Sequence, residues 1–197
     1  MKAYKTDKKT YYKYIERNFV RPNLTADGIM GGGSFAVRGA NNGSNAYLAY
    51  DGNSSTYLAL WTDMVNETYF YNPNPLKINS LGFTYYPTTW IKSGEIYGSN
   101  DDNNYVLLTT FSHSSNSGTV EVNNDTPYKY FKLKVISANG YTGGSGGRYV
   151  IADIYELTFD AIELISIEGT EEDYNYFIEG GAYLLPKNND KYYGITG

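Results

Sequence analysis

Short aromatic and apolar runs, separated by polar turns, recur along most of this chain. Within the runs, apolar and polar positions tend to alternate, which is the period of a half-buried β-strand. The turns between them are rich in Gly, Asn, Asp and Ser. This spacing predicts a β-sandwich or barrel in which helix is scarce. The strands are expected near residues 76–85, 90–97, 105–111, 119–122, 128–137 and 149–159.

Both ends of the chain depart from this pattern. Residues 10–15 alternate only weakly, so an edge strand and a short amphipathic turn both stay open. Residues 174–185 resemble a hairpin with a Gly180-Gly181 turn, and Pro186 is expected to stop its second strand. Because an isolated hairpin is marginal in water, we expect this one to pack on the sandwich, on a neighbouring subunit or on another domain.

Composition narrows the possible classes of protein. A chain of 197 residues can bury one good core, and 23 tyrosines suit half-buried strand faces because a ring can be buried while its hydroxyl stays wet. The absence of cysteine excludes disulfides, zinc thiolate sites and cysteine nucleophiles. The net charge of −5 argues against a nucleic-acid backbone binder.

The first residues are polar and resemble no signal peptide, and no run has the length of a transmembrane helix, so membrane insertion is not expected. The start of the chain is basic and the end acidic. These charges either attract each other, within or between subunits, or form two solvated faces.

The most informative segment is the loop at residues 51–56. Asp51 offers a carboxylate, Asn53 and Thr56 offer neutral oxygens, and Gly52 allows a tight turn that exposes main-chain carbonyls. Such oxygens suit a hard cation. A helical calcium-binding loop is excluded, because Thr56 and Thr62 stand where that loop needs Gly and Glu.

Four motifs in order carry a family resemblance. They lie at residues 50–56 (YDGNSST), 94–101 (GEIYGSND), 130–135 (YFKLKV) and 154–159 (IYELTF). The chain from about 27 to 161 thereby resembles discoidin domains, also called coagulation factor V/VIII type C domains. The resemblance implies an antiparallel β-sandwich of the jelly-roll, galactose-binding-like type. Family 32 carbohydrate-binding modules and phage or bacterial adhesins are the implied relatives.

The resemblance implies three segments: a lead-in at 1–26, the sandwich at 27–161 and a β-rich appendage at 162–197. There are departures from the family pattern. Leu58 stands where the family usually has Trp, and Tyr50 replaces Phe. The strand-end Arg of galactose-binding members is missing from residues 86–90, so galactose is a poor default ligand.

The resemblance also implies a structural ion. Family positions map its ligands onto Asp51, Asn53, Thr56 and Glu156, with carbonyls near Ala49 completing the shell. Ca²⁺ is favoured over Mg²⁺ because irregular, carbonyl-rich loops suit the larger ion. The alternative is that Asp51 caps its own Asx turn while Glu156 pairs with a lysine.

In this family the ligand binds to loops at one end of the sandwich. Sugar recognition needs an aromatic face for the C–H side of a pyranose and a few directional polar groups. For Trp90 a place in the sandwich core is an equal alternative, and Trp61 is assigned to the core. The candidate ligand-binding residues are Arg38, Asn42, Trp90, Tyr141, Arg148 and Tyr149.

Catalysis is not expected. The single histidine, His113, lies in a polar loop with no carboxylate at a spacing that would orient it. The favoured function is a non-catalytic module that binds cell-surface glycan, as part of a phage tail, virion fibre or bacterial surface protein, located on a virion or outside the cell. A structural virion or assembly subunit is the alternative. The tail from about 162 onward is expected to serve homo-oligomeric assembly or tethering.

Overall fold

The computed structural model describes residues 2–5, 11–39, 45–62, 66–143, 149–169, 182–188 and 191–196. The chain divides into two compact units, one formed by Asn18–Ile162 and the other by Met1–Arg17 with Glu163–Gly197. The predicted lead-in is therefore divided, because residues 18–26 belong to the larger unit. The predicted boundary after residue 161 lies one residue from the observed one.

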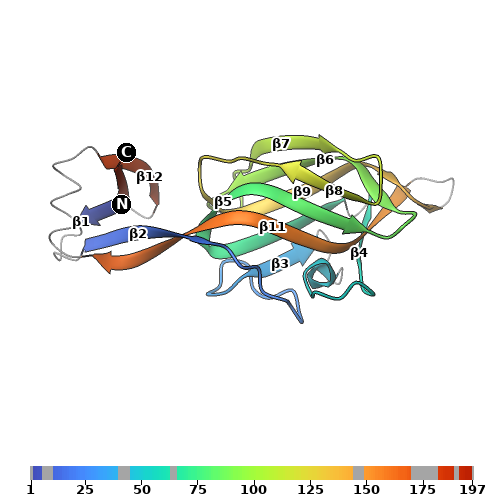
Figure 1. Cartoon of the computed structure of the whole chain (residues 1–197), viewed down its shortest axis with the longest axis horizontal. Coiled ribbons are helices and arrows are strands. Elements are labelled where there is room, and N and C mark those ends of the chain that lie inside the picture. Colours follow the sequence, from blue (N-terminus) through green and yellow to red (C-terminus); the bar gives the residue numbers. More distant parts are fainter. Residues whose placement is uncertain are drawn as a thin grey trace. The chain divides into compact units, whose positions relative to one another are not determined.

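The larger unit is an antiparallel β-sandwich, as predicted, and its only described helix is the short 3-10 helix η1 (Ala46–Ala49). One layer has the strand order β3-β5-β9-β6-β7, and the other is formed by β4, β11, β5 and β8. Figure 1 shows β11 in orange beside β5 in green. The bounds are β3 (Ala36–Gly39), β4 (Leu58–Trp61), β5 (Glu67–Tyr85), β6 (Trp90–Ser99), β7 (Val106–Ser112), β8 (Ser117–Glu121), β9 (Tyr128–Asn139), β10 (Thr142–Gly143) and β11 (Tyr149–Gly169).

Strand β5 belongs to both layers. Its first residues pair with β3 and β9, and residues 80–84 pair with β8. The pairing register shifts between Tyr71 and Leu76, where Pro73 and Pro75 stand. Proline donates no ladder bond, so it is tolerated at such a shift. The sequence pattern predicted only the second half of β5, and it missed the four-residue strands β3 and β4.

The core between the layers is aromatic and aliphatic. The rings of Phe70 and Phe131 stack with centroids 4.9 Å apart, and Phe159 packs edge-on against Phe70 at 5.0 Å. All buried members of the core cluster lie between Phe19 and Ala161. Trp61 is not among them: it is half-buried at the end of β4, contrary to the assignment from sequence.

The smaller unit is also built of strands. They are β1 (Lys2–Lys5), β2 (Tyr11–Asn18), β12 (Ala182–Asn188) and β13 (Lys191–Thr196), together with the last residues of β11. Residues 11–18 are thus a strand, which decides the question left open for 10–15. Pro186 does not stop its strand, contrary to the prediction: β12 runs through it and pairs with β13. The pairing register shifts between Leu185 and Asn188, where a proline without an N–H is tolerated. The predicted Gly180-Gly181 turn lies outside the described residues.

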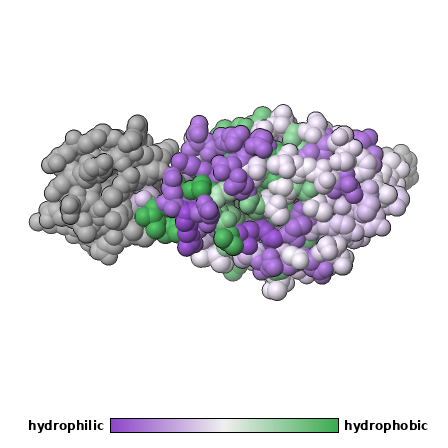
Figure 2. Space-filling model, in the orientation of Figure 1, coloured by the Kyte–Doolittle hydropathy of each residue, from purple (hydrophilic) through white to green (hydrophobic). Residues whose placement is uncertain are grey.

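Surface hydrophobic residues are scattered on the face in Figure 2, where green areas lie among purple and white ones. Within the described part of the chain, no helix is long and apolar enough to cross a membrane.

Candidate functional site

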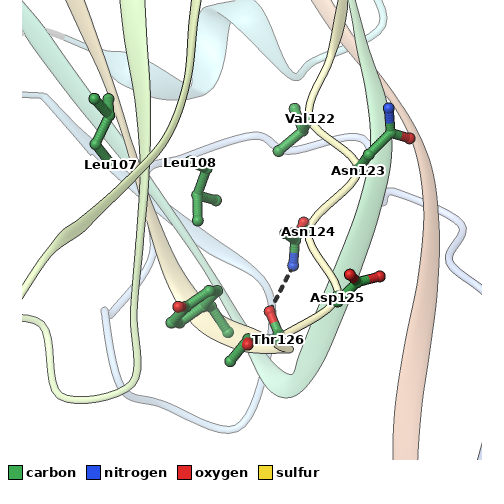
Figure 3. Close-up of a pocket in the computed structure, with 8 residues that line it drawn as sticks. Leu107, Leu108, Val122, Asn123, Asn124, Asp125 and Thr126 are labelled. Atoms are coloured by element: carbon green, nitrogen blue, oxygen red, sulfur yellow. Dashed lines mark hydrogen bonds between the residues drawn. The ribbon is translucent and has the colours of Figure 1, made fainter.

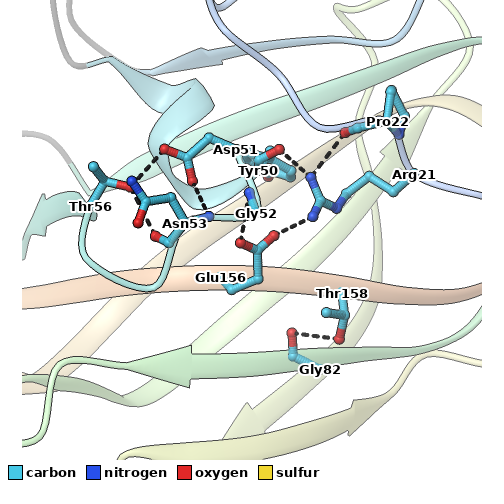
Figure 4. Close-up of polar contacts among 10 residues, drawn as sticks. All are labelled: Arg21, Pro22, Tyr50, Asp51, Gly52, Asn53, Thr56, Gly82, Glu156 and Thr158. Atoms are coloured by element: carbon cyan, nitrogen blue, oxygen red, sulfur yellow. Dashed lines mark hydrogen bonds and ion pairs between the residues drawn. The ribbon is translucent and has the colours of Figure 1, made fainter.

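The loop at residues 51–56 is held by its own side chains. Gly52 adopts φ 74°, a left-handed conformation that favours glycine. Asp51 Oδ1 accepts the Asn53 N–H at 2.9 Å, and Asp51 Oδ2 accepts the Thr56 hydroxyl at 2.6 Å. Asn53 Oδ1 accepts the Ser55 N–H at 3.0 Å. Asp51 and Asn53, both predicted to bind an ion, therefore form consecutive Asx turns, and Figure 4 shows the bonds of Asp51 to Asn53 and Thr56.

Glu156 reaches this loop from β11, as the resemblance implied. Its Oε2 accepts the Gly52 N–H at 3.1 Å, and its Oε1 accepts from the guanidinium of Arg21. Arg21 also donates to the carbonyl oxygens of Tyr50 and, at 3.0 Å, Pro22. Figure 4 shows the guanidinium between Glu156 and the backbone of Tyr50. Sequence reasoning missed Arg21, because it lies 135 positions from Glu156.

In this arrangement the residues do not fit a calcium ion. Calcium needs six to eight oxygen ligands, whereas both carboxylates here already accept N–H or O–H donors and Arg21 places a positive charge at Glu156. Among the described residues, no group of three or more His, Cys, Asp or Glu could hold a metal. Asp51 instead caps its own Asx turn, as the alternative interpretation had it. Glu156 pairs with Arg21, where that interpretation expected a lysine. Calcium binding by these residues stays a prediction, and it would require the hydrogen bonds of Arg21 and of the Asx turns to break first.

Burial and charge act in opposite directions on Glu156. Its pKa lies above the usual value because burial disfavours the charged carboxylate, while Arg21 and the Gly52 N–H act to lower it. The guanidinium side chain of Arg21 is only 11% exposed. The pair is therefore a largely buried one in which each charge needs the other.

Among the predicted ligand-binding residues that the structure describes, Arg38 lies far from Trp90. Arg38 binds Asp102 with two hydrogen bonds, of 3.0 and 3.1 Å, and its guanidinium lies 4.4 Å from the centre of the Tyr69 ring. Through the sheet register, Arg38 is level with Tyr97 on β6, seven positions from Trp90. At a rise of about 3.3 Å per residue, seven positions along a strand separate Arg38 from Trp90 by about 23 Å.

The remaining predicted residues differ in their burial and in whether the structure describes them. Trp90 packs partly buried against the core, and its buried indole Nε1 has no partner in the described part of the chain. Tyr141 is 66% exposed after β9. Tyr149 begins β11, and its side chain lies outside the described part. Asn42 and Arg148 also lie outside the described residues.

A cluster of three tyrosines, which sequence reasoning missed, lies beside the 86–89 turn. Tyr86 follows β5, Tyr57 precedes β4 and Tyr155 lies on β11. Ring centroids are 5.7 Å apart for Tyr86 and Tyr155, and 6.3 Å for Tyr57 with each of them. Tyr57 is 44% and Tyr86 37% exposed. We call Tyr57, Tyr86 and Tyr155 the tyrosine cluster.

Polar contacts fix the turn beside the tyrosine cluster. The Thr89 hydroxyl donates to Asp153 Oδ2 at 2.8 Å, and the Tyr86 N–H donates to the Asp153 carbonyl at 3.0 Å. Asn139 donates to the Thr88 carbonyl at 3.4 Å. Burial raises the pKa of Asp153. The 86–89 turn therefore meets the last residue of β9 and the first part of β11.

The only histidine is part of an aromatic cluster. His113 Nδ1 lies 2.9 Å from the Tyr85 hydroxyl, and its ring is 5.1 Å from that of Phe111 and 5.4 Å from that of Phe83. A hydrolase triad needs a carboxylate at this nitrogen. Here the hydroxyl of Tyr85, and not a carboxylate, lies at this nitrogen.

No family model matches this chain, and no curated protein matches it. Several solved structures do, over 66–68% of this chain. The module CpGH89CBM32-5 of Clostridium perfringens, in complex with GalNAc-β-1,3-galactose, is 18% identical, with 94% of it covered and a TM-score of 0.47. The family 32 carbohydrate-binding module of C. perfringens NanJ, in complex with galactose, is 22% identical; 93% of that module is covered, and the TM-score is 0.48. Chitosan-binding module 1 from a Paenibacillus chitosanase/glucanase is 17% identical; 93% of that module is covered, and the TM-score is 0.45.

Proposed function

We propose that this chain is a non-catalytic carbohydrate-binding module that binds glycan at the tyrosine cluster. The observation that carries the proposal is the cluster itself: three rings in mutual contact, two of them more than one-third exposed, beside the 86–89 turn. A tyrosine ring buries the apolar C–H face of a pyranose, while its hydroxyl exchanges hydrogen bonds with sugar hydroxyls.

Neighbouring groups support this location. The 86–89 turn is fixed by Asp153 and Asn139, so Tyr86 is held in place before a ligand arrives. A pre-ordered surface loses less entropy on binding. Tyr141, on the adjoining segment after β9, is well exposed and bonds through its carbonyl to the Ile151 N–H, so it can add an outer contact.

The setting that we propose is a phage tail, virion fibre or bacterial surface protein that attaches to a cell-surface glycan. This part of the proposal rests on the motif resemblance. Several weak sites displayed together would raise avidity, as an adhesin requires.

The test is glycan-array binding by the full chain, followed by calorimetry with the best glycan. Replacing Tyr57 or Tyr86 with Ala should weaken binding about tenfold, the 1.4 kcal/mol expected of one aromatic contact. Tyr105→Ala is the matched control, because Tyr105, just before β7, bonds to Asp102 and its ring contacts Tyr69 and not the tyrosine cluster. Unchanged affinity in both cluster variants would place the site elsewhere, and no binding to any glycan would refute the function.

A structural or assembly role is the second candidate. It is favoured by the smaller unit, which is compact in itself and has its own strand pairs. A stable oligomer without glycan binding would favour this role.

A further inference from the structure

The segment just before the predicted sandwich lies against the loop at residues 51–56. The Leu24 N–H donates to the Tyr50 carbonyl at 2.9 Å. Asn23 approaches Gly52 so closely that a Cβ on that glycine would lie 2.5 Å from Asn23 Nδ2. Arg21 completes the contact with its bonds to Tyr50 and Glu156. Residues 21–24 therefore cover the turn.

The guanidinium joins three parts of the chain at one point. It donates to the carboxylate of Glu156 on β11, to the carbonyl of Tyr50 in the loop and to the carbonyl of Pro22 in its own segment. It also lies 5.8 Å from the centre of the Tyr50 ring. A planar, permanently charged fork suits such a set of acceptors, because its donors are fixed in direction.

We infer that Arg21 is the built-in cation of this loop and does the structural work that the resemblance assigns to calcium. A carboxylate from the last strand and a carbonyl from the loop are the kinds of oxygen that a loop calcium would bind. Here a side chain of the same polypeptide supplies the positive charge. The loop is therefore held without metal, and it depends on residues 21–24.

Calcium and the guanidinium need the same oxygens of Glu156 and Tyr50, so each excludes the other. Removing the guanidinium leaves Glu156 largely buried and uncompensated, which is destabilising. The same removal leaves Glu156 Oε1 without a described donor and leaves the Tyr50 carbonyl with the Leu24 N–H alone. A variant without Arg21 should thus gain calcium affinity.

The test compares melting temperatures of the full chain in EDTA and in millimolar CaCl₂. The parent should melt at the same temperature in both. Arg21→Ala should melt about 5–10 °C lower in EDTA, and calcium should restore part of the loss. Arg38→Ala is the matched control: it breaks another arginine–carboxylate pair and should show no calcium response.

If Arg21→Ala does not fold, Arg21→Lys keeps the charge but not the fork, and should melt between the parent and the expected alanine value without a calcium response. A parent that loses stability in EDTA and binds one calcium by calorimetry would overturn the inference. So would an Arg21→Lys variant as stable as the parent. Neither outcome depends on glycan binding, so failure here is distinct from failure of the proposed function.

Discussion

At the scale of single residues, His113 shows how packing changes the chemistry of a side chain. The sequence places it in a polar loop, where an exposed ring is expected. The structure packs it against Phe83, Tyr85 and Phe111. Burial lowers its pKa, because the protonated ring loses hydration.

Stability should therefore fall as the pH drops below about 6.5, the ordinary pKa of histidine. Below that pH the unfolded chain binds a proton that folded His113 takes up only at lower pH, so protonation favours the unfolded state. Urea unfolding at pH 5.0, 6.0 and 7.5 measures the effect.

His113→Gln is the control for this prediction and should lose the dependence. Because the chain has no other histidine, the variant isolates this ring. Asp153 and Glu156 act in the opposite direction, since burial raises their pKa values. A parent and variant with the same pH profile would contradict the prediction.

At the scale of elements, Asn124 links the segment before β9 to the bend of β5. Its Oδ1 accepts the Ile78 N–H at 2.7 Å, and its Nδ2 donates to the carbonyls of Thr126 at 2.7 Å and Leu76 at 3.3 Å. Figure 3 shows the bond to Thr126 in the wall of a pocket that is also lined by Leu108. The side chain completes hydrogen bonding where the strand register shifts.

Replacing Asn124 with Ala should lower the free energy of unfolding by about 2–4 kcal/mol. It removes three hydrogen bonds of about 1 kcal/mol each and leaves a buried N–H unpaired. Denaturant unfolding measures the loss. Asp125→Ala, at an exposed neighbour, should cost less than about 0.5 kcal/mol. Equal losses in both variants would show that Asn124 has no special role.

At the scale of the whole molecule, the sandwich contains its own core. Every buried member of the hydrophobic cluster lies within the larger unit, and the Arg21 contact to the loop lies there too. The smaller unit has its own strand pairs, β1 with β2 and β12 with β13. The two units can therefore be studied as separate pieces.

A fragment of residues 18–162 should fold alone and keep the parent's glycan binding. A fragment that starts at 27 should be less stable, because it lacks Arg21 and the residues that cover the loop. Circular dichroism and thermal unfolding distinguish the two.

Light scattering on the 18–162 fragment tests the expected role of the tail in assembly. Loss of the oligomers formed by the full chain would support that role. A fragment that stays unfolded while the full chain is monomeric would show that the smaller unit is needed for the core.

The sequence by itself determined features that depend on neighbouring positions. Alternation and turn residues predicted β6 and β9, and Asp51, Gly52 and Asn53 specify a turn through bonds that span two to five residues. Tertiary structure alone decided which distant groups meet: Arg21 with Glu156, Arg38 with Asp102, and the three rings of the tyrosine cluster. Periodicity fixes which face a side chain takes but not the register between strands far apart in the chain, and register decides these contacts.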